Sequence, residues 1–146
     1  MTRINWNEFW IVWVKIIEEN KNGAVIVVEG QRDLEALRKL WIKGKVILSR
    51  RYDFYTTIEL IRSKGNRVII LTDFDEEGEH EARKLKRELN RIGIKVLDRL
   101  RRNLKNAFRD MKRIEDLSPY IDHLLAKAPL SLYIKHNLQL AKINSP

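Results

Sequence analysis

An unbroken apolar run, Ala24–Val28, lies near the start of the chain, and its last four residues are β-branched. Asn22-Gly23, a pair typical of turns, precedes it. A run of this length without alternating polar residues is typical of a strand buried on both faces of a parallel sheet. Such a strand needs helices on both sides of its sheet. The run therefore predicts an α/β fold.

The following segments alternate between strand and helix patterns. Further strands are predicted at 45–48, 67–71 and 94–97, and helices at 31–41, 52–63 and from Gly78 to 91. Strands that alternate with helices form parallel sheets with right-handed crossovers. We therefore expect a Rossmann-like sheet of roughly four parallel strands, flanked by helices.

Helical patterns also mark both ends of the chain. Residues 5–19 carry apolar residues, three of them tryptophan, at three- and four-residue spacing. This pattern predicts an amphipathic helix that packs on the domain, with a partner-binding helix as the alternative. Helices are also expected after Ser118-Pro119 and after Pro129. The expected segments are an N-terminal helix at 1–21, a central domain at 22–113 and a helical extension at 114–146.

The composition favours a polyanionic partner. The chain has 29 Lys and Arg against 20 Asp and Glu, a net charge of +9, which favours nucleic acid. The alternative is a charged surface of the kind found in heat-adapted proteins. The absence of cysteine excludes disulfides, thiolate zinc sites and cysteine nucleophiles. No apolar stretch is long enough to span a bilayer and no cleavable leader is evident, so the expected location is the cytoplasm.

Acidic residues follow two of the predicted strands. Glu29 comes directly after the first strand, and Asp73 and Asp75 follow the third. Ligands of an open parallel sheet bind beyond the carboxyl ends of its strands. Residues two apart in an extended segment point to the same side, so both aspartates can face one ion. Mg²⁺, or Mn²⁺ in its place, prefers such carboxylates together with water and phosphate oxygens.

Glu29 has two predicted roles, as a further metal ligand and as a general acid or base. Gly30 and Gly78 are expected to let the backbone turn sharply beside the ion, and Asp33 and Glu77 to support the site. The competing interpretation is that the acidic residues cap the helices that follow, which explains Asp33 and Glu77 equally well. Three converging carboxylates without an ion would repel each other, which favours a metal.

Basic and aromatic residues follow the other two strands. After the second strand, guanidinium groups can bind phosphate and an aromatic ring can stack on unpaired bases; these residues are Arg50, Arg51 and Tyr52. After the fourth, the basic run 99–113 is either a solvated helix face or a surface that follows a phosphate backbone. Its predicted nucleic-acid contacts are Arg101, Arg102, Lys105 and Arg109. Lys105 is also predicted to act catalytically by neutralising charge on a phosphate.

Glu29-Gly30 with Asp33, followed further along by Asp73-x-Asp75-x-Glu77-Gly78-Glu79, resembles the Toprim domain. This domain occurs in topoisomerases, bacterial-type primases, OLD-family nucleases, a recombination mediator and the 5S ribosomal RNA maturase. The resemblance covers about residues 22–113 and is strongest to small stand-alone archaeal and bacterial Toprim proteins. It implies that Glu29 is the general acid or base and that Asp73 and Asp75 bind Mg²⁺.

The resemblance also implies phosphodiester chemistry on a nucleic acid. The chain is too short for a topoisomerase gate, lacks the template-binding regions of a primase, and has no Gly-x-x-x-x-Gly-Lys loop for ATP. A small Mg²⁺-dependent endoribonuclease is therefore predicted, acting on RNA rather than DNA, for example in ribosomal RNA processing. The alternative is a non-catalytic module that binds RNA, a ribonucleoprotein or the ribosome.

Overall fold

A computed structural model describes residues 4–143, with side chains described for residues 4–136. Its four strands are β1 (Val25–Val28), β2 (Val46–Leu48), β3 (Arg67–Ile70) and β4 (Lys95–Val96). They form one sheet in the order β2-β1-β3-β4, and every neighbouring pair is parallel. The predicted four-stranded parallel sheet is confirmed.

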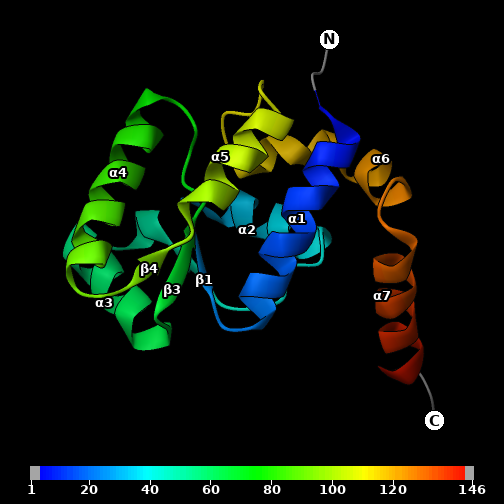
Figure 1. The fold of residues 1–146 in the computed structure, drawn as a ribbon, viewed down its shortest axis with the longest axis horizontal. Helices are drawn as coiled ribbons and strands as arrows, with labels where there is room; N and C mark the ends of the chain where they lie inside the picture. The colour runs from blue at the N-terminus through cyan, green and yellow to red at the C-terminus, as the bar shows by residue number, and fades with distance from the viewer. Residues whose placement is uncertain (1–3, 144–146) are drawn as a thin grey trace.

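Helices cover both faces of this sheet. The helices of the described chain are α1 (Trp6–Lys21), α2 (Gln31–Lys39), α3 (Phe54–Lys64), α4 (Glu76–Arg91), α5 (Asp98–Ala107), α6 (Ile121–Ala126) and α7 (Leu130–Ile143), with 3₁₀ turns η1 (Ser49–Arg51) and η2 (Ile114–Tyr120). In Figure 1, α3 and α4 lie on one side of the sheet, and α1, α2 and α5 lie on the other. Within the described residues, no helix is both long and apolar enough to cross a membrane.

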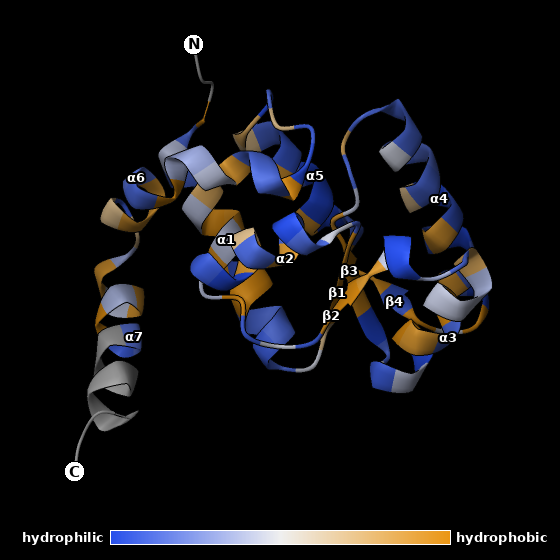
Figure 2. Ribbon diagram, turned by 180° about the vertical axis from the view of Figure 1, so that it is seen from behind, coloured by the Kyte–Doolittle hydropathy of each residue, from blue (hydrophilic) through white to orange (hydrophobic). Residues whose placement is uncertain are grey.

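The β1 strand explains why the fold has two faces. Ile26 and Val28 belong to the larger core, which contains residues of α1, α2 and α5, whereas Val25 and Val27 belong to the smaller core under α3 and α4. Successive side chains of a strand point to opposite faces, so a strand between two helical layers must be apolar throughout. Figure 2 shows hydrophobic strands between helices of mixed colour.

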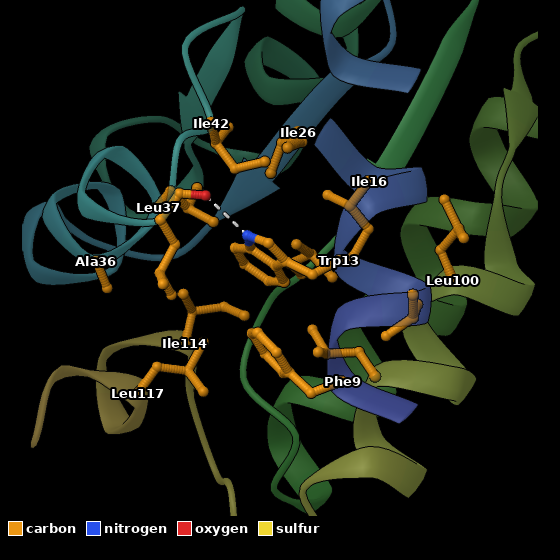
Figure 3. Close-up of a cluster of buried hydrophobic side chains, with 14 of the residues drawn as sticks. Phe9, Trp13, Ile16, Ile26, Ala36, Leu37, Ile42, Leu100, Ile114 and Leu117 are labelled. Carbon is orange, nitrogen blue, oxygen red and sulfur yellow. Dashed lines mark hydrogen bonds between the residues drawn. The ribbon is translucent and has the colours of Figure 1, made fainter. Parts of the chain in front are cut away.

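The aromatic residues of α1 anchor the larger core (Figure 3). Phe9 and Trp13 are fully buried and stack with ring centroids 5.1 Å apart. The ring nitrogen of Trp13 donates to the Leu40 carbonyl oxygen at 2.9 Å. The ring nitrogen of Trp10 donates to the Leu124 carbonyl oxygen at 2.8 Å. These bonds tie α1 to the end of α2 and to α6, so this helix packs against the rest of the fold.

The C-terminal extension shares the same core. Residues of η2 and α6 belong to the cluster that contains Phe9 and Trp13; they are Ile114, Leu117, Ile121 and Leu124. Near the N-terminus, Ile4 forms an antiparallel bridge with Phe108. Residues of all three expected segments, 1–21, 22–113 and 114–146, thus pack around one core. Their division into separate units stays a prediction from the sequence.

Two helix boundaries differ from the prediction for local reasons. The helix expected to reach Trp41 ends at Lys39, because Trp41 adopts a left-handed φ of 71°. The helix expected to begin after Gly78 begins at Glu76, because the Asp75 side chain caps it. Gly78 therefore lies in the first turn of α4 rather than in a loop before it.

Candidate functional site

The carboxyl ends of β1 and β3 bring Glu29 and Asp73 together. β1 and β3 are neighbours in the sheet, and each acidic residue follows its strand. The Asp73 backbone N–H donates to Glu29 Oε2 at 2.7 Å. The two side chains are 12% and 10% exposed. The structure thus places a largely buried carboxylate pair at the edge of the sheet where ligands bind in open α/β folds.

Arg50, in the turn η1 after β2, faces both carboxylates. Its Nη2 lies 3.6 Å from Glu29 Oε1 and 3.7 Å from Asp73 Oδ2. The Arg50 backbone N–H also donates to the Glu29 carbonyl oxygen at 3.1 Å, which joins the two strand ends. Because the Arg50 side chain is 65% exposed, its positive charge lies on the solvent side of the acidic pair.

The local charges shift the acidity of Asp73. Burial raises the pKa of Asp73 to about 7, and the charge of Glu29 and a hydrogen bond with it act in the same direction. The positive charge of Arg50 opposes this shift. Near neutral pH, Asp73 is therefore present in both its acid and its carboxylate forms.

Asp75 does not join the pair, and its predicted role as a metal ligand is not realised in this arrangement. Its Oδ1 accepts the Gly78 backbone N–H at 2.8 Å and so caps α4. Across the described side chains, no group of three Asp, Glu, His or Cys residues is arranged to hold a metal ion. The helix-capping interpretation therefore applies to Asp75.

Glu29 and Asp73 nevertheless fit a hard divalent cation. Mg²⁺ commonly uses one or two protein carboxylates and keeps water or phosphate oxygens in its remaining positions. The guanidinium of Arg50 already stands where positive charge is favoured, beside an oxygen of each carboxylate. Glu29 and Asp73 would therefore be the two protein ligands of the ion. The next carboxylate along the chain, that of Asp75, caps α4.

The predicted supporting residues have different roles. Asp33 is buried and accepts the backbone N–H groups of Gly30 at 3.1 Å and of Glu115 at 2.9 Å. Burial raises the pKa of Asp33, while these two hydrogen bonds lower it. Asp33 therefore fastens the start of α2 to η2. Glu77 is exposed in the first turn of α4.

The two glycines expected to allow sharp turns also differ. Gly30 has an extended backbone with φ of −141°, which any residue adopts, so its predicted conformational role is wrong. A Cβ atom at Gly78, in contrast, would lie 2.0 Å from the Asp73 carbonyl oxygen. Gly78 is required because α4 passes directly against the backbone that carries Asp73.

We expect Gly78→Ala to lower the free energy of unfolding by about 1–3 kcal/mol, the usual cost of overpacking. The matched control is Gly30→Ala, because its new Cβ would meet only Arg50 Nη1 at 3.5 Å, an ordinary contact. Urea denaturation of both variants measures the difference. Equal midpoints for the two variants would contradict this account of Gly78.

Two further charged residues belong to the site and were not predicted as site residues. Burial raises the pKa of Glu81, the charges of Glu29 and Glu77 add to the shift, and a hydrogen bond with Ser49 opposes it. A hydrogen bond with Glu115 raises the pKa of Arg113, and so does the charge of Asp73. The sequence signal for Glu81 is its spacing of four residues from Glu77, which places both on one side of α4.

The predicted nucleic-acid contacts after β2 are exposed. Arg50, Arg51 and Tyr52 lie at the surface, at the end of the strand next to β1. Nη2 of Arg51 donates to Gln31 Oε1 at 3.0 Å, which links η1 to the start of α2. These three side chains form an accessible basic and aromatic segment after β2, and Arg50 is the one that faces Glu29 and Asp73.

The basic residues of α5 and of the segment after it separate into exposed and structural ones. Arg102 and Arg109 are exposed. Arg101 is buried, and its guanidinium donates to backbone carbonyl oxygens, so the prediction that it contacts nucleic acid is wrong. The Lys105 ammonium donates to the carbonyl oxygens of Arg109 and Met111, both at 2.6 Å, and burial lowers its pKa. These bonds hold the end of α5, and a catalytic role for Lys105 stays a prediction.

The raised pKa of Asp73 predicts a pH-dependent stability in the presence of a chelator. The folded protein binds this proton more tightly than the unfolded chain, whose Asp pKa is near 3.8. Stability should therefore fall as the pH rises from about 4 to about 7. Asp73→Asn is neutral throughout, so we expect it to melt a few degrees higher than the wild type at pH 8 and similarly near pH 4.

Thermal melts in EDTA at both pH values test this, with Asp122→Asn, an exposed carboxylate on α6, as the control. Added Mn²⁺ should stabilise the wild type at pH 8 and stabilise Asp73→Asn less. A melting temperature of Asp73→Asn below that of the wild type at pH 8 would contradict the burial argument.

Comparisons with known proteins agree with the fold. Residues 24–109 match the model of the Toprim domain. A UPF0292 protein of Methanosarcina acetivorans is 34% identical over 126 residues, which cover 86% of this chain and 88% of the relative. A UPF0292 protein of Methanocaldococcus jannaschii is 35% identical over 82% of this chain and 97% of its own length. A solved structure of a protein from Aquifex aeolicus superimposes with a TM-score of 0.62 at 32% identity, covering 71% of this chain and 94% of that one.

Proposed function

Because the chain belongs to the Toprim domain family, we propose that it is a small Mg²⁺-dependent endoribonuclease that processes structured RNA. The family is associated with metal-dependent chemistry on nucleic acids. The observation that carries the proposal is the buried pair of Glu29 and Asp73, which faces the exposed guanidinium of Arg50 at the carboxyl edge of the sheet. We place this activity in the cytoplasm as part of the same proposal.

Each residue of the pair has a definite part in the proposed reaction. Glu29 and Asp73 supply hard oxygen ligands, and a bound Mg²⁺ would polarise a phosphoryl oxygen and lower the pKa of water. Glu29 moves a proton at the attacking or leaving oxygen, the role implied by the resemblance of the Glu29-Gly30 motif. Arg50 orients the phosphate through its exposed guanidinium.

RNA is favoured over DNA by the surroundings of the pair. Tyr52 is exposed and follows Arg50 and Arg51 in the chain, and Tyr55 is exposed in the first turn of α3. Arginine and tyrosine side chains suit single-stranded loops, whose unstacked bases lie on aromatic rings while guanidinium groups bind phosphates. The net charge of +9 adds a sequence-independent attraction to the backbone.

A non-catalytic role in binding RNA or a ribonucleoprotein such as the ribosome is the second candidate. The observation that favours it is the capping of α4 by Asp75, which turns this carboxylate toward the Gly78 N–H. Arg50 also supplies positive charge to the pair without an ion. A Toprim domain without catalytic activity would use these acidic residues as helix caps and ion-pair partners, and the same arrangement would result.

The two candidates differ in turnover. We expect the purified protein to cleave an end-labelled structured RNA in Mg²⁺, to be inactive in EDTA, and to leave a DNA of the same sequence intact. A gel assay over Mg²⁺, Mn²⁺ and a range of temperatures measures this. Tight RNA binding without cleavage under all of these conditions would favour the binding module, and cleavage of DNA alone would overturn the choice of substrate.

A further inference from the structure

A second cavity lies at the opposite edge of the sheet from the carboxylate pair. Its walls come from the end of α1, the loop between α2 and β2, and α7, and its volume is about 280 Å³. Lys21 and Gly44, which line it, precede β1 and β2, whereas Glu29 follows β1. In Figure 1, α7 lies on the far side of α1 from α4. This cavity is therefore separate from the site described above.

The cavity combines apolar walls with a cluster of cations. Ile17, Trp41 and Leu132 supply the apolar wall. The positively charged lining residues are Lys21, Lys43 and Lys135. Among the described residues, no acidic side chain lines it. A pocket with an apolar wall and convergent charges of one sign suits an organic ligand that carries the opposite charge.

The lysines are close enough to act on one another. A hydrogen bond with Lys135 lowers the pKa of Lys21, and the positive charge of Lys135 adds to this shift. Burial lowers the pKa of His136, and the charges of Lys43, Lys135 and Lys21 act in the same direction. The ammonium groups of Lys21 and Lys135 repel each other, and an anion between them would reduce this repulsion.

His136 provides a second, independent observation. It is 9% exposed and lines the cavity, and its Nδ1 is buried without a hydrogen-bond partner in the structure. Buried polar atoms normally have a partner, so an unpaired ring nitrogen beside a cavity calls for an explanation. Its ring stacks on Trp41 with centroids 4.5 Å apart and an interplanar angle of 11°. This stacking fixes the position of the imidazole at the cavity wall.

The backbone of Trp41 is also unusual. It is the one non-glycine residue with positive φ in the described chain, at 71°. Such a conformation is unfavourable for a residue with a side chain and persists where surrounding contacts hold it. Here the Trp41 ring contacts Trp10, Tyr133 and His136, so the strained residue forms the wall between the core and α7.

We propose that this cavity binds a phosphomonoester of a nucleoside, with the phosphate among the lysines and His136 and the organic part against Ile17, Trp41 and Leu132. A phosphomonoester carries nearly two negative charges and several acceptor oxygens at neutral pH, which matches the lysine ammonium groups that line the cavity. The ligand is either a free nucleotide or the 5′-phosphate end of an RNA. The proposal does not depend on metal binding or cleavage at Glu29 and Asp73.

Calorimetric titration of the full-length protein in EDTA tests the proposal, with AMP, adenosine, and one short RNA with and without a 5′-phosphate as probes. We expect AMP or the phosphorylated RNA to bind with one-to-one stoichiometry, and adenosine and the unphosphorylated RNA to bind at least tenfold more weakly at this site. Binding of AMP identifies a free nucleotide as the source, and binding of the phosphorylated RNA alone identifies an RNA end.

Variants separate this site from general attraction to a basic protein. Lys135→Gln should weaken binding about 10- to 100-fold, as expected for loss of a charge-assisted hydrogen bond of about 1.5–3 kcal/mol. His136→Phe keeps a ring against Trp41 but removes the polar imidazole from the cavity wall, and it should weaken binding as well. Lys15→Gln, at an exposed position of α1, is the matched control and should bind as the wild type does.

A melting temperature of Lys135→Gln equal to or above that of the wild type would show that the variant is folded, since it removes a repulsion. If neither AMP nor the phosphorylated RNA binds, or if Lys135→Gln and Lys15→Gln weaken binding equally, the proposal is overturned.

Discussion

Replacing Arg101 with methionine is expected to lower the free energy of unfolding by about 3–5 kcal/mol, the usual result of removing one partner from a buried charged network. Nη1 of Arg101 donates to the carbonyl oxygens of Ile70 at 3.1 Å and Thr72 at 2.8 Å. Its Nη2 donates to the Asp73 carbonyl oxygen at 2.8 Å and to Glu79 Oε1 at 2.7 Å. Methionine replaces the aliphatic stem of arginine but has no guanidinium and no donor, so these acceptors lose their partner.

The control for this substitution is the adjacent residue of the same helix. The Arg102 side chain is 65% exposed, and its ion pair is with Asp98 at 3.6 Å. Surface pairs of this kind contribute about 0–1 kcal/mol, so Arg102→Met should change the stability little. Urea denaturation of both variants gives the two free energies. A loss in Arg101→Met no larger than that in Arg102→Met would show that the network contributes little to stability.

Arg101 also links stability to the site. Its guanidinium holds the backbone from Ile70 to Asp73, the segment that carries Asp73 to the sheet edge, and lies 4.4 Å above the Phe74 ring. We therefore expect any folded Arg101→Met protein to bind Mn²⁺ more weakly than the wild type. Arg101 thus positions the strand end and does not bind the substrate.

The role of Arg101 shows where sequence reasoning ends. The apolar spacing of Leu100 and Leu104 within a basic run predicts a helix, and α5 is there. Which arginine of that helix points inward depends on how the helix is rotated against β3, and this rotation is set by tertiary contacts. On this helix Arg102 lies opposite the stripe of Leu100 and Leu104, whereas Arg101 lies at the edge of the stripe, and packing against β3 decides that Arg101 is buried.

The sheet was predictable because its signals are local. The all-apolar Val25–Val28 strand implies helices on both faces, and the alternation of elements gives the parallel order without knowledge of distant contacts. The same rule placed Glu29 and Asp73 at neighbouring strand ends. The left-handed backbone of Trp41, which ends α2 early, was not predicted. Such a conformation of tryptophan has no sequence signature, and here contacts of the ring with α1 and α7 hold it.

Asp75 was misplaced for a different physical reason. The two-residue period that pairs it with Asp73 applies to extended backbone with no competing partner. The first turn of α4 offers unpaired N–H groups at the same point, and the Gly78 N–H takes the Asp75 carboxylate. Glu81 was not predicted as a site residue, because the side of α4 that faces Ser49 is set by tertiary packing and not by the local sequence.

Glu29→Gln is expected to lower the rate of RNA cleavage by about 10²- to 10⁴-fold, the usual cost of losing a proton-transfer group. Glutamine has the size of glutamate, and its carbonyl oxygen can still accept the Asp73 N–H, so the strand ends should stay in place. It cannot accept or release a proton at neutral pH. RNA affinity should change little, since it rests on arginines such as Arg50 and Arg51.

The rate and the affinity are measured separately, by single-turnover cleavage of labelled RNA and by binding in EDTA. Glu59→Gln, which alters an exposed carboxylate of α3 paired with Arg62 at 3.9 Å, is the matched control and should cleave at the wild-type rate. A Glu29→Gln protein that binds and cleaves like Glu59→Gln would remove Glu29 from the reaction and leave the fold unaffected. Loss of cleavage with binding intact would instead assign the chemical step to the carboxylate that β1 places beside Asp73.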